Sequence, residues 1–162
     1  MCIDPAKRYT AEMRTSLGSM VIALDATSAP LTVNNFVFLS RYHYYDGVGF
    51  HRIIKNFMCQ GGDPEGTGRG GPGYRFADEL PKAGRYSVGS AAMANSGPNT
   101  NGSQFFLISG PDGVRLAPQY SLFGTIVKGL EVLATMQAVK TGSGDKPATP
   151  VVIESVTITE VD

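Results

Sequence analysis

The feature that most restricts the fold of this chain is that its apolar runs are short and end at turn residues. Glycine occurs 20 times and proline 10 times in 162 residues, scattered between the apolar runs rather than gathered in one segment. Where a run continues, as at Met20, Ile22 and Leu24, the apolar side chains recur at every second position, which is the period of a strand. Many short strands joined by tight turns indicate an antiparallel β-barrel.

The strands can be placed from this alternation and from the turn residues that bound each run. A first hairpin is expected to pair two strands around a turn at Leu17-Gly18. The expected strands, in chain order, are residues 9–15, 19–25, 48–54, 57–61, 91–94, 105–108, 122–127 and 151–159.

Two segments have the helical period instead. Residues 30–42 repeat apolar side chains at Val33, Phe36 and Val37, and Pro30 is tolerated in a first turn. Residues 130–139 carry a shorter apolar stripe that a glycine closes. A barrel has two open ends, and we expect the two helices to cover them.

Composition limits the class of partner. The length of 162 residues suits one domain spanning residues 1–162, large enough to bury roughly 70% of its unfolded surface. Fourteen basic residues balance fourteen acidic ones, which disfavours binding to nucleic acid or to an anionic membrane. Cys2 and Cys59 suggest neither a metal site nor a disulfide framework. A reducing compartment and a monomer are therefore expected.

The N-terminal residues 1–13 contain no apolar stretch of signal-peptide length, and no apolar run reaches the roughly 18 residues of a membrane span. We expect a cytoplasmic protein that makes no membrane contact through this domain. The alternative is an extracytoplasmic domain excised from a longer, membrane-anchored chain.

Two segments combine one arginine, amide side chains and apolar side chains. They are residues 50–63, with the sequence FHRIIKNFMCQGGD, and residues 93–107, with the sequence MANSGPNTNGSQFFL. Neither segment holds a nucleophile with a base to activate it. The pattern therefore suits a reaction in which no covalent bond is made or broken, such as rotation about a peptide bond.

Both segments resemble the sequence patterns of the cyclophilins, which are peptidyl-prolyl cis/trans isomerases. The pattern FHR(I/V)IxxFMxQGGD is matched in the first segment and MANxGxxTNGSQFF in the second, in the expected order. The similarity extends over roughly residues 11–160 and is closest to a divergent bacterial kind. It implies a closed eight-stranded antiparallel β-barrel with an α-helix over each end. It also implies isomerisation of X-Pro bonds in unfolded or flexible protein segments, without a cofactor.

The resemblance makes Arg52 the catalytic residue. An X-Pro bond rotates over a barrier of ~18–20 kcal/mol, because twisting removes the partial double-bond character of the C–N bond. A permanently charged guanidinium can donate to the prolyl nitrogen as its lone pair localises, without giving up a proton. The alternative role of Arg52 is a surface salt bridge.

An apolar pocket for the proline ring is implied at Phe57, Met58, Phe106 and Leu116. Strict strand alternation would point Phe57 and Met58 to opposite faces, so their joint use requires an irregular backbone or a bent strand end. Phe105 and Phe106 also face opposite ways. The resemblance assigns Phe106 to the pocket and leaves Phe105 in the core.

Substrate binding is further implied at Gln60, Asn95 and Gln104, whose amides can pair with the backbone of an extended peptide. Ala94 is small enough to let that backbone approach. The alternative for each amide is that it holds its own loop.

The match to the family loosens after Phe106. Many members place a tryptophan just before the leucine that aligns with Leu116, and a histidine four residues after it; here Arg115 and Tyr120 stand at those positions. Tyr120 still offers an aromatic edge and a hydroxyl to the pocket. Because the indole N–H is absent, we expect cyclosporin to bind with reduced affinity.

The remaining motifs give little indication of function. Gly66, Gly68 and Gly71 satisfy GxGxxG, but a proline follows where a dinucleotide-binding helix would begin, so the segment is expected to be a flexible surface loop. His43 and His51 are the only histidines and have no metal-ligand spacing, and we expect His51 to be a hydrogen-bonded structural histidine. No metal site is expected.

Two alternatives to an active isomerase stay open. One is a module of the same fold that binds proline-containing peptides with little catalysis, which the presence of Arg52 disfavours. The other is a carrier of small molecules with a hollow barrel, which is disfavoured because large side chains fill a barrel of this size. Proline-containing polypeptides are the expected partners of an active isomerase and of a proline-binding module alike.

Overall fold

The computed structural model describes all residues from 1 to 162 and contains one eight-stranded sheet. The strands lie in the order β3-β4-β6-β5-β7-β2-β1-β8, and every neighbouring pair is antiparallel. Their bounds are β1 Arg8–Thr15, β2 Gly18–Leu24, β3 Arg52–Ile54, β4 Met58–Gly61, β5 Ser90–Met93, β6 Phe105–Ile108, β7 Leu122–Lys128 and β8 Ile153–Val161.

The predicted strands are all present, with bounds that differ by a few residues at most in all but one case. The exception is the segment predicted as residues 48–54, of which only β3 is a strand. Before β3 the chain makes a single bridge, from Gly49 to Val152. The first turn also lies one residue earlier than expected, at Ser16 and Leu17, because Gly18 already pairs with Thr15.

Glycine is required at position 18 for two reasons. Its φ of +133° is one that other residues rarely adopt. A Cβ there would also lie 2.8 Å from a methyl group of Val132 on the helix that packs below the hairpin.

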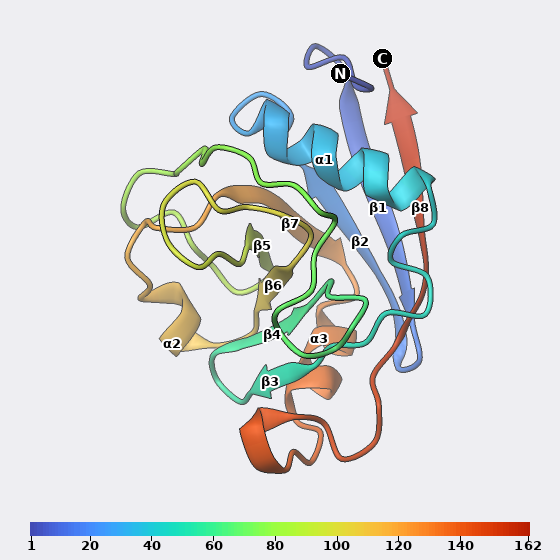
Figure 1. Cartoon of the computed structure of the whole chain (residues 1–162), viewed down its shortest axis with the longest axis vertical. Coiled ribbons are helices and arrows are strands. Elements are labelled where there is room, and N and C mark those ends of the chain that lie inside the picture. The colour runs from blue at the N-terminus through green and yellow to red at the C-terminus, as the bar shows by residue number, and fades with distance from the viewer.

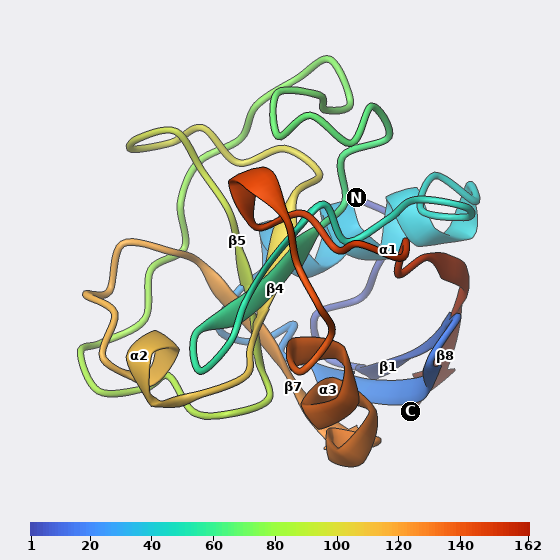
Figure 2. The ribbon, with the colours of Figure 1, turned by 90° about the horizontal axis from the view of Figure 1, so that it is seen from below.

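The sheet is strongly curled, as the view from below shows (Figure 2), but it does not close completely. The edge strands β3 and β8 do not pair with each other; the chain before β3 is joined to the start of β8 by the bridge from Gly49 to Val152 and by backbone hydrogen bonds of 2.8 Å between residues 47–50 and 151–153. The expectation of a closed barrel was therefore too strong. The three residues of β3 pair with β4 alone.

Two longer helices lie towards opposite ends of the curled sheet (Figure 1): α1, Pro30–Arg41, and α3, Leu130–Gln137. Both were predicted within two residues. The sequence patterns missed a short helix, α2 (Pro111–Val114), and a 3₁₀ turn, η1 (Ser143–Asp145), because neither is long enough to show a period. The helix α2 stands beside the candidate site and directs the chain back towards it.

The apolar side chains form two separate clusters. The main core contains 28 buried residues and includes Phe36 of α1 packed edge-on against Phe105 at 5.7 Å between ring centroids. A satellite cluster on the other side of β5 and β6 contains five buried residues: Met58, Tyr86, Ala92, Phe106 and Ile108. This satellite cluster forms the floor of the site described next.

Candidate active site

An apolar cavity of about 160 Å³ opens over the satellite cluster. This volume suits one small side chain, since pockets for drug-sized ligands measure about 300–1,000 Å³. We call it the apolar cavity. Its lining consists of Arg52, Phe57, Met58, Gln60, Ala94, Asn95, Phe106, Leu116 and Tyr120.

Three of these residues come from adjacent strands in register. Arg52 of β3 pairs with Gln60 of β4, and Gln60 pairs in turn with Phe106 of β6. Directly paired residues in an antiparallel sheet project on the same face, so the arginine, the amide and the ring form one row across the sheet. A polar edge thus lies beside an apolar floor.

Phe57 and Met58 both reach the cavity because the backbone is irregular before β4. Asn56 has a positive φ of 65°, and the N–H of Phe57 donates to the carbonyl of Ile54 at 3.1 Å in a turn. Phe57 therefore precedes the strand, whose alternation begins only at Met58. This is the bent strand end that joint use of the two side chains required.

Phe105 and Phe106 divide as expected. Phe105 is fully buried in the main core, where its ring also packs edge-on against Tyr45 at 5.5 Å. Phe106 lies in the satellite cluster and lines the apolar cavity.

The guanidinium of Arg52 is exposed and has neither an ion pair nor a hydrogen bond to another protein group. The surface salt bridge considered from the sequence is therefore absent. All of its N–H donors can turn towards a ligand in the apolar cavity.

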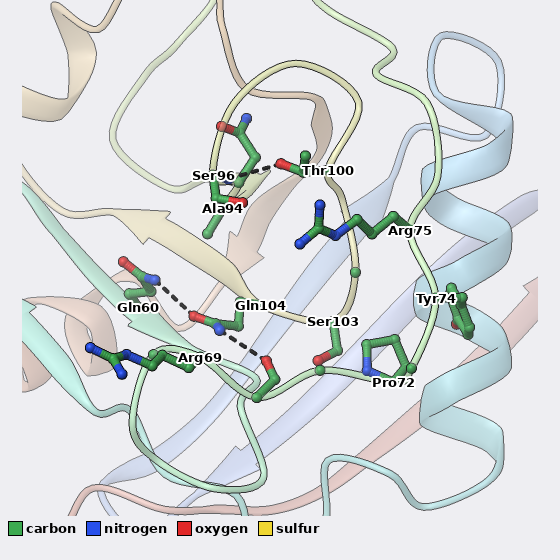
Figure 3. A pocket seen from close by; sticks show the side chains of 16 residues that line it. Gln60, Arg69, Pro72, Tyr74, Arg75, Ala94, Ser96, Thr100, Ser103 and Gln104 are labelled. Atoms are coloured by element: carbon green, nitrogen blue, oxygen red, sulfur yellow. Dashed lines mark hydrogen bonds between the residues drawn. The ribbon is translucent and has the colours of Figure 1, made fainter.

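Gln104 does not line the apolar cavity; it holds the residues that do. Its Oε1 accepts a hydrogen bond from Nε2 of Gln60 at 3.0 Å, and its Nε2 donates to the carbonyl of Gly70 at 3.0 Å (Figure 3). The amide thus ties β4 to the loop after it. Gln60 keeps its Oε1 and its second N–H for a ligand.

Asn95 lines the apolar cavity, but its side chain is committed to its own surroundings. Its Nδ2 donates to the carbonyl of Gln119 at 2.9 Å, and its Oδ1 accepts from the N–H of Gly97 at 3.2 Å. The local loop thus already engages both polar atoms of this amide, and substrate binding by the Asn95 side chain stays a prediction. The backbone N–H and C=O of Asn95 have no partner, whereas the preceding Ala94 donates to Gln104 at 3.0 Å.

Tyr120 packs edge-on against Phe106, with ring centroids 5.3 Å apart at 89°. It is positioned by Tyr86, which the sequence analysis missed. The hydroxyl of Tyr86 donates to the carbonyl of Tyr120 at 2.6 Å and accepts from its N–H at 3.2 Å. No local pattern could have identified Tyr86, because its partner is 34 residues away.

Leu116 reaches the apolar cavity directly after α2, whereas Arg115 does not line it. The guanidinium of Arg115 pairs instead with Asp112 at 3.1 Å and is exposed. Position 115 therefore adds no donor to the apolar cavity.

A second, larger cavity of about 760 Å³ adjoins the first and shares Gln60, Ala94 and Asn95 with it. We call it the polar cavity. Figure 3 shows it between β6 and the loop that follows β4, with side chains directed into it from both sides. Its remaining lining consists of Gly68, Arg69, Gly70, Gly71, Pro72, Gly73, Tyr74, Arg75, Ser96, Thr100, Gly102, Ser103 and Gln104.

The loop beside the polar cavity is organised around the carboxylate of Asp63, which is 1% exposed. Its oxygens accept from the backbone N–H groups of Glu65 at 2.8 Å, Thr67 at 3.0 Å and Gly68 at 2.7 Å. Burial by itself would raise the pKa of Asp63, but these backbone donors, with that of Gly70, hold the pKa below its usual value. The GxGxxG segment is therefore a structured loop wrapped around a buried charge.

Two other titratable groups lie near the site. Burial raises the pKa of the Cys59 thiol to about 12, so the side chain stays uncharged. Burial likewise lowers the pKa of His51, and its Nδ1 is buried without a hydrogen-bond partner. The expectation of a hydrogen-bonded histidine was wrong, because no protein group lies within hydrogen-bonding distance of this buried nitrogen. No cluster of three or more His, Cys, Asp or Glu side chains could hold a metal ion.

Comparison with known proteins identifies one family. The family model described as "Cyclophilin type peptidyl-prolyl cis-trans isomerase/CLD" matches residues 10–158. A protein named peptidyl-prolyl cis-trans isomerase-like 1 from Gibberella zeae is 46% identical, with 91% of this chain and 93% of that protein aligned. Peptidyl-prolyl cis-trans isomerase A of Mycobacterium tuberculosis is 43% identical, covering 96% of this chain and 94% of its own.

Solved structures agree with the sequence relatives. The crystal structure of a cyclophilin-type isomerase from Cryptosporidium parvum superposes with a TM-score of 0.88 at 34% identity, over 94% of this chain and 98% of that one. The same protein was also crystallised in the presence of the dipeptide Ala-Pro, and that structure gives a TM-score of 0.87 at 35% identity, over 93% of this chain and 98% of that one. Separately, no helix here has the length and apolar character to cross a membrane.

Proposed function

Since this chain belongs to the cyclophilin-type peptidyl-prolyl cis-trans isomerase family, we propose that Arg52 and the apolar cavity are the parts of it that lower the barrier to X-Pro rotation. The protein is an enzyme, a peptidyl-prolyl isomerase, as are its named relatives at 43–47% identity over most of the chain. The proposal concerns which residues do this work and how.

The observation that carries the proposal is an unpaired guanidinium beside an apolar cavity of the right size. Arg52 has no protein partner, and the cavity holds about 160 Å³ between Phe57, Met58 and Phe106. A proline ring in the cavity would be gripped without polar contacts, while its nitrogen faces the arginine. As the bond twists, the nitrogen lone pair localises and becomes a better acceptor, so the hydrogen bond is strongest in the transition state.

The other half of the rotating bond must also be held. The free backbone N–H and C=O of Asn95 offer an extended peptide the pairing of a strand edge, which does not depend on its side chains. The remaining donor and acceptor of Gln60 lie between this edge and Arg52. The backbone of Asn95 and the side chain of Gln60 would together hold one side of the X-Pro bond while the other side rotates.

The substrates we propose are X-Pro segments of unfolded or flexible proteins, bound by a monomer without a cofactor. The relative crystallised with Ala-Pro supports a proline-containing peptide as the ligand. Weak binding of cyclosporin and a cytoplasmic location stay predictions. Cell fractionation with an antibody to the chain tests the location.

A bacterial origin is likewise proposed. The matched relatives come from fungi, plants and mycobacteria, so the family alone does not decide it. The absence of tryptophan, with Arg115 and Tyr120 at the two divergent positions, is what supports the bacterial kind.

NMR exchange spectroscopy on a short Ala-Pro peptide tests the function directly. Catalysis broadens and merges the cis and trans signals at substoichiometric enzyme, whereas binding alone shifts resonances without exchange between them. If the cis and trans signals merge with the unmodified protein but not with Arg52→Ala, the proposal is supported. Shifts without exchange in the unmodified protein would indicate the alternative, a proline-binding module.

A further inference from the structure

We propose that the polar cavity selects substrates with an acidic side chain two residues from the proline, through Arg69 and Arg75. This inference rests on the proposed use of the apolar cavity for the proline ring. It adds a specificity determinant for the same reaction.

The two cavities are placed to act on one peptide. They share Gln60, Ala94 and Asn95, so a chain bound in the apolar cavity continues into or out of the polar one. In an extended peptide, residues i and i±2 project on the same face, about 6.6 Å apart. A proline ring in the apolar cavity therefore directs the side chain two positions away towards the polar cavity.

The lining of the polar cavity is positively charged in a chain with no net charge. It includes Arg69 and Arg75 and no aspartate or glutamate. Neither guanidinium has an ion pair or a hydrogen bond within the protein. Figure 3 shows Arg75 reaching towards the space between Thr100 and Gln104, and Arg69 drawn below Gln60.

The nearby carboxylates form no ion pair with Arg69 or Arg75, and their oxygens are hydrogen-bonded elsewhere. Asp63 accepts backbone N–H groups of its loop, Asp78 accepts from Asn101 at 2.8 Å, and Glu79 accepts from Thr32 on α1 at 2.7 Å. Glu65 is the one carboxylate of the loop without a partner, and it does not line the cavity. A carboxylate of the substrate is the missing counter-charge.

Both arginines extend from anchored backbone, which limits the entropy lost on binding. Arg75 lies between Tyr74, whose hydroxyl bonds Asn35 of α1, and Phe76, whose N–H donates to Asn101 at 3.0 Å. On the other side of the cavity, Arg69 lies between two residues whose backbones are hydrogen-bonded. Its neighbour Gly68 donates to Asp63, and Gly70 accepts from Gln104.

The test compares peptides that carry Asp or its neutral isostere Asn at each position from three before to three after a single proline. We expect kcat/KM to be about two- to tenfold higher for Asp at one of the two positions two residues from the proline, the range for one or two exposed ion pairs. The higher kcat/KM should come from a lower KM with kcat unchanged, because the polar cavity does not contact the rotating bond. It should fade in ~1 M salt, where the screening length is only about 3 Å.

Variants locate the effect. Arg69→Gln and Arg75→Gln should each lower the ratio of Asp to Asn peptide, and the double variant should bring it close to one. Arg14→Gln is the matched control: it removes the same charge from an exposed, unpaired arginine on β1, far from both cavities. Its ratio should equal that of the unmodified protein.

The outcomes separate this inference from the proposed function. If Asn peptides are turned over but the ratio is near one at every position, the acidic preference is wrong while the isomerase site stands. An equal loss of the ratio in Arg14→Gln would attribute it to overall charge and also overturn the inference. If no peptide is turned over, the proposed function itself fails.

Discussion

The apolar and polar cavities share an edge and differ in what builds them. The apolar cavity lies on three paired strands, β3, β4 and β6, over a floor of fully packed side chains. The polar cavity lies between β6 and a loop whose shape depends on the buried carboxylate of Asp63. One is held by the sheet ladder and the other by side-chain to backbone hydrogen bonds.

This difference indicates which cavity suits catalysis and which suits substrate selection. Stabilising a transition state requires donors fixed to within a fraction of an ångström, which backbone ladders supply. Recognising a charged side chain tolerates looser geometry, and a loop can vary for it without disturbing the sheet. We therefore expect changes in the apolar cavity to affect turnover of every substrate, and changes in the polar cavity to affect the choice among substrates.

The largest effect is expected from Arg52→Ala. Removing one preorganised donor typically lowers the rate by roughly 100- to 1000-fold. The residue is exposed and unpaired, so the fold should be unaffected. We expect that loss in kcat/KM for Asp and Asn peptides alike, with an unchanged thermal midpoint. Retention of more than half the activity would remove Arg52 from this role and break the comparison.

Cyclosporin affinity should respond next, since it reports on the rim of the apolar cavity. The absent indole should weaken binding by about 1–3 kcal/mol, or roughly tenfold to a hundredfold, relative to a family member with the tryptophan. Arg115→Trp should recover part of this, and its fluorescence can report binding because the chain has no other tryptophan. Arg115→Phe is the control that adds an aromatic ring without an N–H. Equal affinity in all three proteins would mean that position 115 does not contact the drug.

Asp63→Asn tests whether the polar cavity can be disturbed without affecting the apolar cavity. The variant leaves buried backbone donors poorly paired, and we expect a loss of about 1–3 kcal/mol in the free energy of unfolding at neutral pH. Because the folded-state pKa of Asp63 lies below its unfolded value, its contribution is present above about pH 4 and is lost as pH falls through the folded pKa. Urea denaturation at several pH values should show the two proteins converging in acid.

The matched control for that measurement is Glu65→Gln, which removes an exposed carboxylate from the same loop. The acidic preference should fall further in Asp63→Asn than turnover of a neutral peptide does. If both fell equally, the loop would support the apolar cavity as well, and the division between the two would be wrong.

The smallest effect is expected at Cys59, which lies beside Met58 and could be mistaken for a nucleophile. Its pKa of about 12 keeps the thiol protonated, and rotation requires no attack on the carbonyl. We expect kcat/KM to be nearly flat from about pH 6 to pH 9, and Cys59→Ala to stay active apart from a packing loss. A steep rise near the ordinary thiol pKa of ~8.5, abolished in Cys59→Ala, would contradict bond rotation as the mechanism.

Local patterns were sufficient for much of the fold and part of the site. Alternation and turn residues located the strands, and the helical period located α1 and α3. The two family motifs contain seven of the nine residues that line the apolar cavity, and the looser alignment after Phe106 supplied Leu116 and Tyr120. These features are local in sequence, so a short window contains the information that determines them.

What could not be predicted depends on partners far along the chain. Gln104 was predicted to bind the substrate, but its hydrogen bonds to Gln60 and Gly70, 44 and 34 residues away, could not be predicted. The side chain of Asn95 is used by Gln119, and Tyr86 holds Tyr120 from a separate loop. A side chain's free hydrogen-bonding atoms are known only when its neighbours are known.

The sequence by itself determined that this chain forms a curled antiparallel sheet with two covering helices, and that Arg52 and a set of apolar residues share its surface. The elements of the fold followed from side-chain period and turn chemistry, which act over a few residues, whereas the site residues followed from the resemblance to the family motifs. Only the tertiary structure decided that the sheet stays open between β3 and β8, and that a glycine-rich loop folds around Asp63. It alone placed two unpaired arginines at a cavity beside the apolar one, because Arg69 and Arg75 come from a loop whose path depends on the backbone donors that the completed fold brings to the buried carboxylate of Asp63 and on contacts with distant residues.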